Sequence, residues 1–144
     1  GPAYKGIFIG SIVSMILSKH GTNYPLSFNR KETKDHGEGG NIIGSNPKGN
    51  VLIIDDVISA GTAAKESIES IKSLGANPNI MLVGLDRQEK GQGSLSARAE
   101  LEDLYGMQVI SIINLDALIQ FSEKDPVYSE YLPNLKAYRE SWGA

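Results

Sequence analysis

Short apolar runs alternate along this chain with longer stretches in which apolar residues recur at helical spacing. This alternation is typical of an α/β domain built on an open, mostly parallel sheet flanked by helices. It predicts strands over about 25–29, 51–54, 80–85 and 109–113, and helices over about 6–19, 64–75, 95–105 and 114–121. A helical tail follows from residue 126 and breaks or restarts at Pro133. Residues 88–94 form a glycine-rich loop, and residues 30–50 form a loop long enough to be functional or mobile.

Two apolar runs set the expectations for the core. Residues 51–54 are four consecutive apolar side chains, which is typical of a strand buried on both faces, so we expect the central strand here. Residues 6–17 form an apolar run of 12 residues, short of the roughly 20 that span a bilayer. Because no small-x-small cleavage site follows it, we interpret this run as a buried helix rather than a secretory segment.

The most informative segment is VLIIDDVISAGTA, residues 51–63. The strand brings Asp55 and Asp56 to its carboxyl end, where open α/β sheets bind ligands, and adjacent side chains there point to opposite faces. Two carboxylates near a core imply hydroxyl donors, Mg²⁺ or cations nearby. Small residues, a glycine and two hydroxyls follow just before a helix, a composition suited to binding a phosphate at the helix N-terminus.

On the residues alone one other interpretation of this segment stays open, and two further motif matches are rejected. A plain strand and turn, with Thr62 as helix cap and both aspartates solvated, fits about equally well. An apolar run ending in acids also describes a Walker B strand, but no Gly-x-x-x-x-Gly-Lys-Ser/Thr loop accompanies it. Residues 91–96 almost match the dinucleotide-binding pattern, although Ser96 replaces the third glycine.

Composition narrows the classes of function. The net charge is −3 and the sequence pI is about 5.4, which argues against a strongly basic nucleic-acid binder. The chain has no cysteine and only two histidines, so thiolate chemistry is excluded and imidazole metal clusters are disfavoured. We expect one domain over 1–144, with no nucleic-acid or membrane partner.

Residues 51–63 resemble the phosphoribosyl-diphosphate motif of the type I phosphoribosyltransferases. FNRKETKDHGEGG at 28–40 and LDRQEKG at 85–91 resemble the orotate phosphoribosyltransferases specifically, as do GPAYKG at 1–6 and the tail LKAYRESWGA. The resemblance covers nearly the whole chain. It implies transfer of a 5-phosphoribosyl group from phosphoribosyl diphosphate to orotate, giving orotidine 5′-phosphate and diphosphate in pyrimidine synthesis.

The resemblance also implies roles for particular residues. Those expected to contact phosphoribosyl diphosphate are Tyr4, Lys5, Arg30, Lys31, Lys34, His36, Asp55, Asp56, Val57, Ile58, Ser59, Ala60, Gly61, Thr62 and Ala63. A catalytic part falls to Arg30, Lys34, His36, Asp55 and Asp56. Orotate is expected to contact Ser59, where the family commonly has threonine, and Arg87. Next to Arg87, Asp86 is either a second polar candidate or its structural ion-pair partner.

Three partners follow from the same resemblance. Mg²⁺ is expected to be carried by the diphosphate rather than by direct protein ligands, with Asp55 and Asp56 acting through water. A homodimer is expected, in which the charged loop closes as a lid over the neighbouring subunit's site. The enzyme is expected in the cytoplasm.

The first residues bear on the length of the chain. Gly1-Pro2 resembles a tag remnant, yet it also fits the family's own Gly-Pro-Ala-Tyr-Lys-Gly. We therefore expect the chain to begin inside the enzyme and to lack an upstream hood segment. Two alternatives to orotate transfer are another phosphoribosyltransferase, such as a purine-specific one, and a non-catalytic module that binds phosphoribosyl diphosphate.

Overall fold

The computed structural model describes residues 1–30 and 41–144. The chain divides into two compact units. The first unit comprises Gly1–Asp56 and Thr62–Leu82, and the second comprises Val57–Gly61 and Val83–Ala144. The expectation of a single domain over 1–144 stays a prediction.

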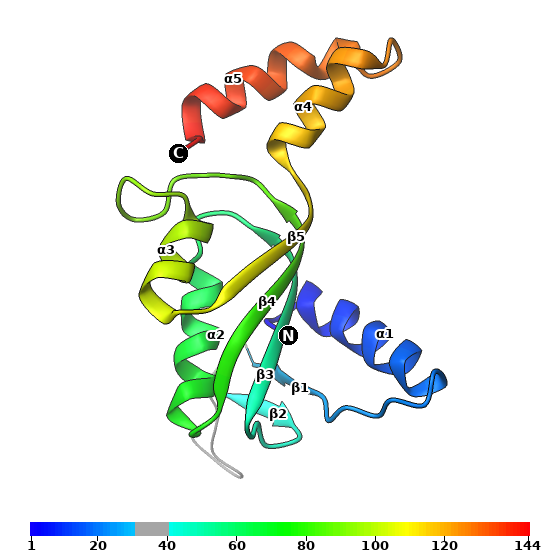
Figure 1. Cartoon of the computed structure of the whole chain (residues 1–144), viewed down its shortest axis with the longest axis vertical. Helices are drawn as coiled ribbons and strands as arrows, with labels where there is room; N and C mark the ends of the chain where they lie inside the picture. The colour runs from blue at the N-terminus through cyan, green and yellow to red at the C-terminus, as the bar shows by residue number, and fades with distance from the viewer. Residues whose placement is uncertain (31–40) are drawn as a thin grey trace. The chain divides into compact units, whose positions relative to one another are not determined.

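The sheet has three strands, β3 (Asn50–Ile58), β4 (Asn77–Asp86) and β5 (Gln108–Asn114). The helix α2 (Thr62–Ser73) connects β3 to β4, and α3 (Ala97–Tyr105) connects β4 to β5 (Figure 1). Helical crossovers of this kind join parallel strands, so the predicted α/β class is confirmed. The strand order is β3-β4-β5, which places β4 in the centre. The prediction that residues 51–54 form the central strand is therefore wrong within the described sheet.

Both outer strands are more exposed than their apolar sequences predict. On β3 the Leu52 side chain is 47% exposed, and on β5 Ile112 is 81% exposed. Only Ile53 and Ile58 of β3 and Val109 of β5 are buried. An apolar run shows that a strand is suited to burial, but the neighbours that bury it come from elsewhere in the chain. The predicted burial of residues 51–54 on both faces is thus wrong for the described residues.

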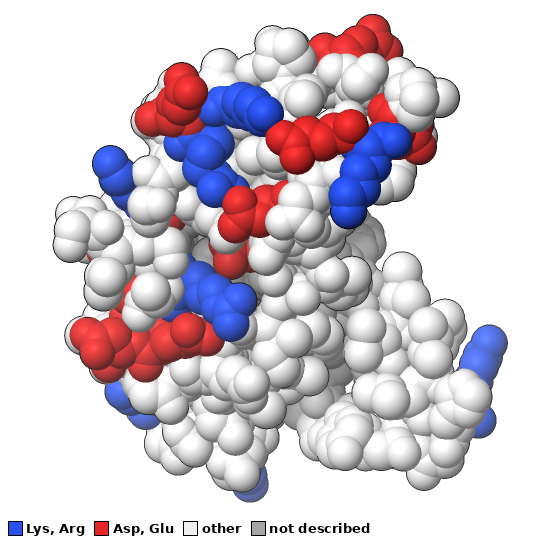
Figure 2. Space-filling view, turned by 45° about the horizontal axis from the view of Figure 1, so that its top comes forward, with Lys and Arg blue, Asp and Glu red and all other residues white. Residues whose placement is uncertain are grey.

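The first helix, α1 (Lys5–Lys19), confirms the predicted helix but not its burial. Its two buried residues are glycines, Gly6 and Gly10. A Cβ on Gly6 would lie 2.7 Å from the carbonyl oxygen of Ile54, so the missing side chain lets the helix approach β3 closely. The opposite side exposes four large apolar side chains, Phe8, Ile12, Met15 and Ile16. In Figure 2 the α1 lobe at lower right is nearly free of charge.

None of the helices in residues 1–30 and 41–144 is both long and apolar enough to cross a membrane. Charged side chains of both signs intermingle over α4 (Leu115–Lys124) and α5 (Leu132–Trp142), in the upper part of Figure 2.

Residues 25–50 contain a feature that the pattern did not predict. The strands β1 (Ser27–Asn29) and β2 (Ile42–Gly44) pair antiparallel, with Phe28 opposite Ile43. The predicted loop over 30–50 is therefore wrong for residues 42–44, where two isoleucines form a strand too short to show a period. Gly44 ends it at φ +97, a conformation that favours glycine.

The remaining helices agree with their sequence signals. In α2 the apolar stripe Ala64, Ile68 and Ile71 is buried, as its spacing predicts. In α3 the side chain of Ser96 accepts a hydrogen bond from the Ala99 amide, so the helix begins two residues later than predicted. Asn114 caps α4 through the Ala117 amide. The tail restarts at Pro133 as expected, with the 3₁₀ turn η1 (Ser129–Tyr131) leading into α5.

Candidate functional site

The acidic pair lies near the end of β3, in the first unit. Its side chains have different environments, as alternation along a strand requires. The Asp56 carboxylate pairs with the ammonium group of Lys5, Nζ to Oδ2 2.8 Å, and the Lys5 side chain is 76% exposed. Asp55 accepts a hydrogen bond from the amide of Asp56 at 2.9 Å. The first turn of α1 thus supplies a cation that the sequence alone did not connect with this pair.

Asp55 is the member of the pair whose ionised form the fold disfavours. Burial raises the pKa of its carboxyl, and the neighbouring charge of Asp56 raises it further, while the amide of Asp56 acts in the opposite sense. A Cβ on Gly6 would also lie 3.2 Å from Oδ1 of Asp55, so this part of α1 approaches the carboxylate closely. A carboxylate held in this way gains stabilisation from any hydroxyl donor or cation that reaches it.

The chain that follows the acidic pair turns sharply before α2 begins. Gly61 has φ +80, which only glycine adopts without strain, and a Cβ there would lie 3.4 Å from the Cβ of Ala97. The carbonyl of Ile58, the last residue of β3, accepts a hydrogen bond from the amide of Arg87 at 3.1 Å. Of the segment after β3, the residues Ala60, Thr62 and Ala63 are exposed. The predicted phosphate-binding segment therefore leaves residues on both sides of Gly61 open to solvent.

Arg87 lies directly after β4, in the second unit, as the sequence predicts. Its Nε donates to Oε1 of Glu89 at 2.9 Å, and its guanidinium also donates to the hydroxyl of Tyr138. The ring of Tyr138 lies 5.1 Å from the guanidinium carbon. Asp86, only 5% exposed, accepts a hydrogen bond from the amide of Gln88 at 2.8 Å. Asp86 thus holds the turn, while Glu89 is the acid that pairs with Arg87.

Sequence reasoning missed the residues that surround Arg87. Glu89 stands two positions further along the chain, a spacing that could have suggested a shared side. Tyr138 is 51 residues away, and no local pattern connects it with Arg87. Such a contact is decided by the path of the chain, so only the structure could reveal it.

The other predicted residues lie at the start of α1 and around the charged loop. Tyr4 immediately precedes α1, and its side chain is 60% exposed. The amide of Arg30 donates to the carbonyl of Asn41 at 2.7 Å. Lys31, Lys34 and His36 lie outside the described residues, so their expected roles stay predictions.

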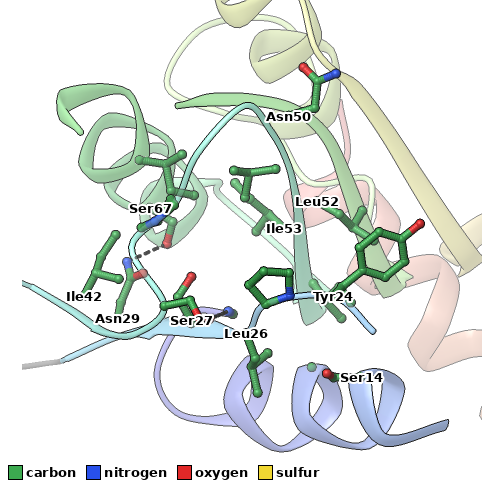
Figure 3. A pocket seen from close by; sticks show the side chains of 18 of the residues that line it. Ser14, Tyr24, Leu26, Ser27, Asn29, Ile42, Asn50, Leu52, Ile53 and Ser67 are labelled. Atoms are coloured by element: carbon green, nitrogen blue, oxygen red, sulfur yellow. Dashed lines mark hydrogen bonds between the residues drawn. The ribbon is translucent and has the colours of Figure 1, made fainter. Parts of the chain in front are cut away.

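A cavity of about 790 Å³ lies in the first unit, beside α1 and β3. Figure 3 shows side chains from α1, β1, β3 and α2 around it, among them Ser14, Ser27 and Ile53. In the wall of this cavity the side-chain amide of Asn29, through Nδ2, donates to the hydroxyl of Ser67 at 3.0 Å. None of Asp55, Asp56 and Lys5 lines this cavity. It is therefore a separate, mainly apolar feature and not the predicted ligand site.

A parallel sheet with helical crossovers, in which an acidic pair lies near the end of β3 and a glycine turn follows this strand, defines the type I phosphoribosyltransferase class. No family model matches the chain. An orotate phosphoribosyltransferase of Actinobacillus succinogenes is 54% identical over 144 residues, covering 99% of this chain and 67% of that protein. The chain belongs to the orotate phosphoribosyltransferase family.

Solved structures agree with this assignment. The crystal structure of orotate phosphoribosyltransferase from Francisella tularensis superposes with a TM-score of 0.77 at 31% identity, over 100% of this chain and 69% of that one. The structure of Leishmania donovani UMP synthase gives a TM-score of 0.76 at 28% identity, over 99% of this chain and 28% of that one. The chain thus spans about two thirds of the length of its bacterial relatives.

Proposed function

We propose that this chain transfers the 5-phosphoribosyl group of phosphoribosyl diphosphate to orotate, forming orotidine 5′-phosphate and diphosphate in pyrimidine biosynthesis. The observation that carries the proposal is 54% identity over 99% of the chain to a protein of this name. The glycine turn at Gly61 and the arginine after β4 supply residue types that suit a phosphate and a carboxylate.

The phosphoribosyl donor is assigned to the segment that follows the apolar part of β3. Asp55 and Asp56 would accept hydrogen bonds from the ribose hydroxyls. Residues 57–63 would bind the 5′-phosphate through backbone amides, the hydroxyls of Ser59 and Thr62, and the N-terminus of α2. The solvent exposure of Ala60, Thr62 and Ala63 supports this assignment.

The diphosphate is assigned to cations from two parts of the chain. Lys5 is exposed and paired with Asp56, so it can exchange this partner for a diphosphate oxygen at little cost. Tyr4 precedes it. Arg30, Lys31, Lys34 and His36 complete the proposed set, the last three outside the described residues. Donors that approach the leaving group as its charge grows stabilise the transition state more than the ground state.

Mg²⁺ would neutralise the charge of the diphosphate. In residues 1–30 and 41–144 no three acidic or imidazole side chains converge on one point, so the chain offers no cage of its own in this part. Two adjacent carboxylates fit a weaker role, because Mg²⁺ keeps several waters and takes most of its ligands from phosphate oxygens. Asp55 and Asp56 would therefore hold the ion through water.

Orotate carries a ring carboxylate, which the forked donors of Arg87 suit, and Ser59 would supply a hydroxyl. In the reaction the bond from the anomeric carbon to the diphosphate oxygen breaks, and its electron pair leaves with the diphosphate. A ring nitrogen of orotate then forms the new bond to that carbon, and the proton that this nitrogen carried is released to the diphosphate or to water. No protein nucleophile is needed, so the residues contribute by positioning and by electrostatic stabilisation.

The assembly is also part of the proposal. The exposed apolar stripe of α1, made of Phe8, Ile12, Met15 and Ile16, supports a second copy of this chain as its cover. The closing of the charged loop over the neighbouring subunit, and the cytoplasmic location, stay predictions from the family resemblance.

The test is an orotate-depletion assay with phosphoribosyl diphosphate and Mg²⁺, followed by absorbance. We expect orotate to disappear and orotidine 5′-phosphate and diphosphate to form in equal amounts. Adenine and hypoxanthine replace orotate in parallel reactions, and use of either purine instead would favour the purine-specific alternative. Binding of phosphoribosyl diphosphate in calorimetry without turnover of any base would favour a non-catalytic module.

A further inference from the structure

Arg87 is the centre of a small polar cluster within the second unit. Its Nε and one terminal nitrogen donate to Glu89 and Tyr138, and the Tyr138 hydroxyl donates in turn to the same oxygen of Glu89. The three side chains thus close a ring of hydrogen bonds. A guanidinium has five N–H donors, so two are used here and three remain for a ligand, counting partners among the described residues.

The backbone that carries Arg87 and Glu89 is itself attached to the last helices. Gln88 adopts φ +52, an unusual value for a residue other than glycine. Its side-chain amide donates to Asp116 at 2.9 Å and accepts from the Asp116 amide at 2.8 Å. Arg139 of α5 pairs with Asp116 at 2.6 Å and also donates to Gln88.

The end of the chain adds main-chain contacts to the same segment. The amide of Lys90 donates to the carbonyl of Trp142 at 2.9 Å, and the amide of Ala144 donates to the carbonyl of Gln88 at 3.2 Å. None of the residues of α5 is buried, so polar contacts rather than an apolar interface attach this helix to residues 86–90. The polar contacts of α5 therefore fix the position of residues 86–90, the segment that carries Arg87.

The Tyr138 hydroxyl suits the task of holding a guanidinium. It accepts from Arg87 and donates to Glu89, so it joins a donor and an acceptor that point at one another. Burial, followed by the bond to Glu89, raises the pKa of Tyr138. Glu89, with its side chain 12% exposed, balances the charge of Arg87 without taking up all of its donors.

We propose that Tyr138 and Glu89 are positioning residues that hold the guanidinium of Arg87 in the orientation that binds the carboxylate of the acceptor. This inference rests on the proposed role of Arg87 in orotate binding. Fixing the side chain before the ligand arrives removes an ordering cost from binding, so the benefit is in acceptor affinity. The C-terminal helix α5 thereby becomes part of the specificity of the enzyme for its acceptor.

The alternative is that the cluster only attaches α5 to the rest of the second unit. Both interpretations predict a loss of stability when the cluster is disrupted. They differ in which KM changes. A positioning role changes the KM for orotate alone and requires Arg87, whereas a purely structural role does not single out one substrate. The test therefore separates the two substrates and includes a background without Arg87.

The experiment measures steady-state kinetics of Tyr138→Phe and Glu89→Gln, with Tyr131→Phe as the matched control on η1. We expect the KM for orotate to rise about ten-fold in both cluster variants, because each loses a hydrogen bond to a charged group. The KM for phosphoribosyl diphosphate should stay unchanged, as should both constants of the control. In the Arg87→Ala background, Tyr138→Phe should have no further effect on orotate use.

A second measurement does not depend on turnover. In ¹⁵N NMR spectra, the Nε–H signal of Arg87, identified by its loss in Arg87→Ala, should be slow to exchange with water and should broaden in Tyr138→Phe. Equal changes in both substrates' KM values, or an unchanged signal with unchanged orotate KM, would overturn the inference. Absence of turnover in the unsubstituted chain would instead count against the proposed function, while the NMR result would still decide whether Tyr138 holds Arg87.

Discussion

Two charged groups at the ends of β3 and β4 are held in opposite ways. Within residues 1–30 and 41–144, Asp56 pairs with Lys5, whose side chain is 76% exposed and belongs to the first turn of a helix. Arg87 is held by a carboxylate, a hydroxyl and an aromatic ring, with the Glu89 side chain only 12% exposed. The first arrangement can exchange partners, whereas the second keeps its geometry. This difference fits the two proposed substrates. Phosphoribosyl diphosphate brings its own charges, whereas the planar orotate must be held in one orientation.

Two aspartates show the same contrast in their ionisation. Burial raises the pKa of Asp55 in the first unit. Hydrogen bonds from Gln88, and then from Arg139, lower the pKa of Asp116 in the second unit. The fold thus disfavours the ionised form of Asp55 and favours the ionised form of Asp116.

The largest effect is expected at the glycine turn. Gly61→Val should reduce affinity for orotidine 5′-phosphate roughly 100-fold or more, because a side chain at φ +80 displaces several amides from the phosphate. Gly75→Val is the matched control, since Gly75 has φ +77 and open space around its Cβ position. Both variants should lose about 1–2 kcal/mol of stability from backbone strain. Calorimetry that shows equal affinity for the two variants would contradict the phosphate assignment.

The proposed orotate contact is tested by a substitution that keeps the positive charge of Arg87 but removes the two parallel donors of its guanidinium. Arg87→Lys should raise the KM for orotate about ten-fold, because a single ammonium nitrogen cannot offer a carboxylate the two parallel donors of a guanidinium. The KM for phosphoribosyl diphosphate should not change. Arg98→Lys, on the surface of α3, is the control and should leave both constants as they are. An equal rise for both substrates would show that Arg87 does not distinguish the acceptor.

The exchangeable partner is tested by Lys5→Met. We expect a loss of up to about five-fold in affinity for phosphoribosyl diphosphate, in line with the small contribution of an exposed ion pair. The melting temperature should change little. The difference from the unsubstituted chain should shrink as salt is added, because salt screens exposed charges. A large loss of stability with unchanged affinity would mean that the pair is structural, and Lys65→Met provides a comparison on α2.

The smallest effects concern stability against pH, and they have opposite signs. Because the pKa of Asp55 is raised in the fold, its ionisation costs stability as the pH rises through the unfolded value of 3.8 and the folded value above it. Asp55→Asn should therefore stabilise the chain at neutral pH. The pKa of Asp116 is lowered, so its contribution is present above 3.8 and is lost as the pH falls through the folded value. Asp116→Asn should destabilise the chain at neutral pH.

Thermal melts of the two variants between pH 3 and 7, beside the unsubstituted chain, check these signs. Both differences should diminish at the acid end, where the carboxyl groups are protonated. Two shifts of the same sign would contradict the contrast between the two aspartates.

Local structure was largely predictable from the sequence. The spacing of Ala64, Ile68 and Ile71 defines the buried face of α2, and Ser96 and Asn114 cap their helices as such residues usually do. The acidic pair and the glycine turn were also predictable, since both depend on consecutive residues. These features follow from backbone preferences that act over a few positions.

The sequence predicted less well which side chains are buried and which segments pack against one another. The apolar run of β3 does not predict that the strand lies at the edge of the described sheet. The apolar run of α1 does not predict that its glycines face β3. The short strand β2 has only three residues, too few for a period. The position of β3, the buried face of α1 and the formation of β2 each depend on a segment from another part of the chain.

The sequence by itself determined the family and the α/β class, and it predicted the residues that are proposed to bind the phosphate and the acceptor. Only the tertiary structure decided that Lys5 neutralises Asp56 and that Tyr138 and Glu89 hold Arg87. The physical reason is that motifs and periodicity reflect local backbone geometry, whereas these partners lie 51 residues apart in each long-range case, Lys5 to Asp56 and Arg87 to Tyr138. Their meeting is set by the path of the whole chain.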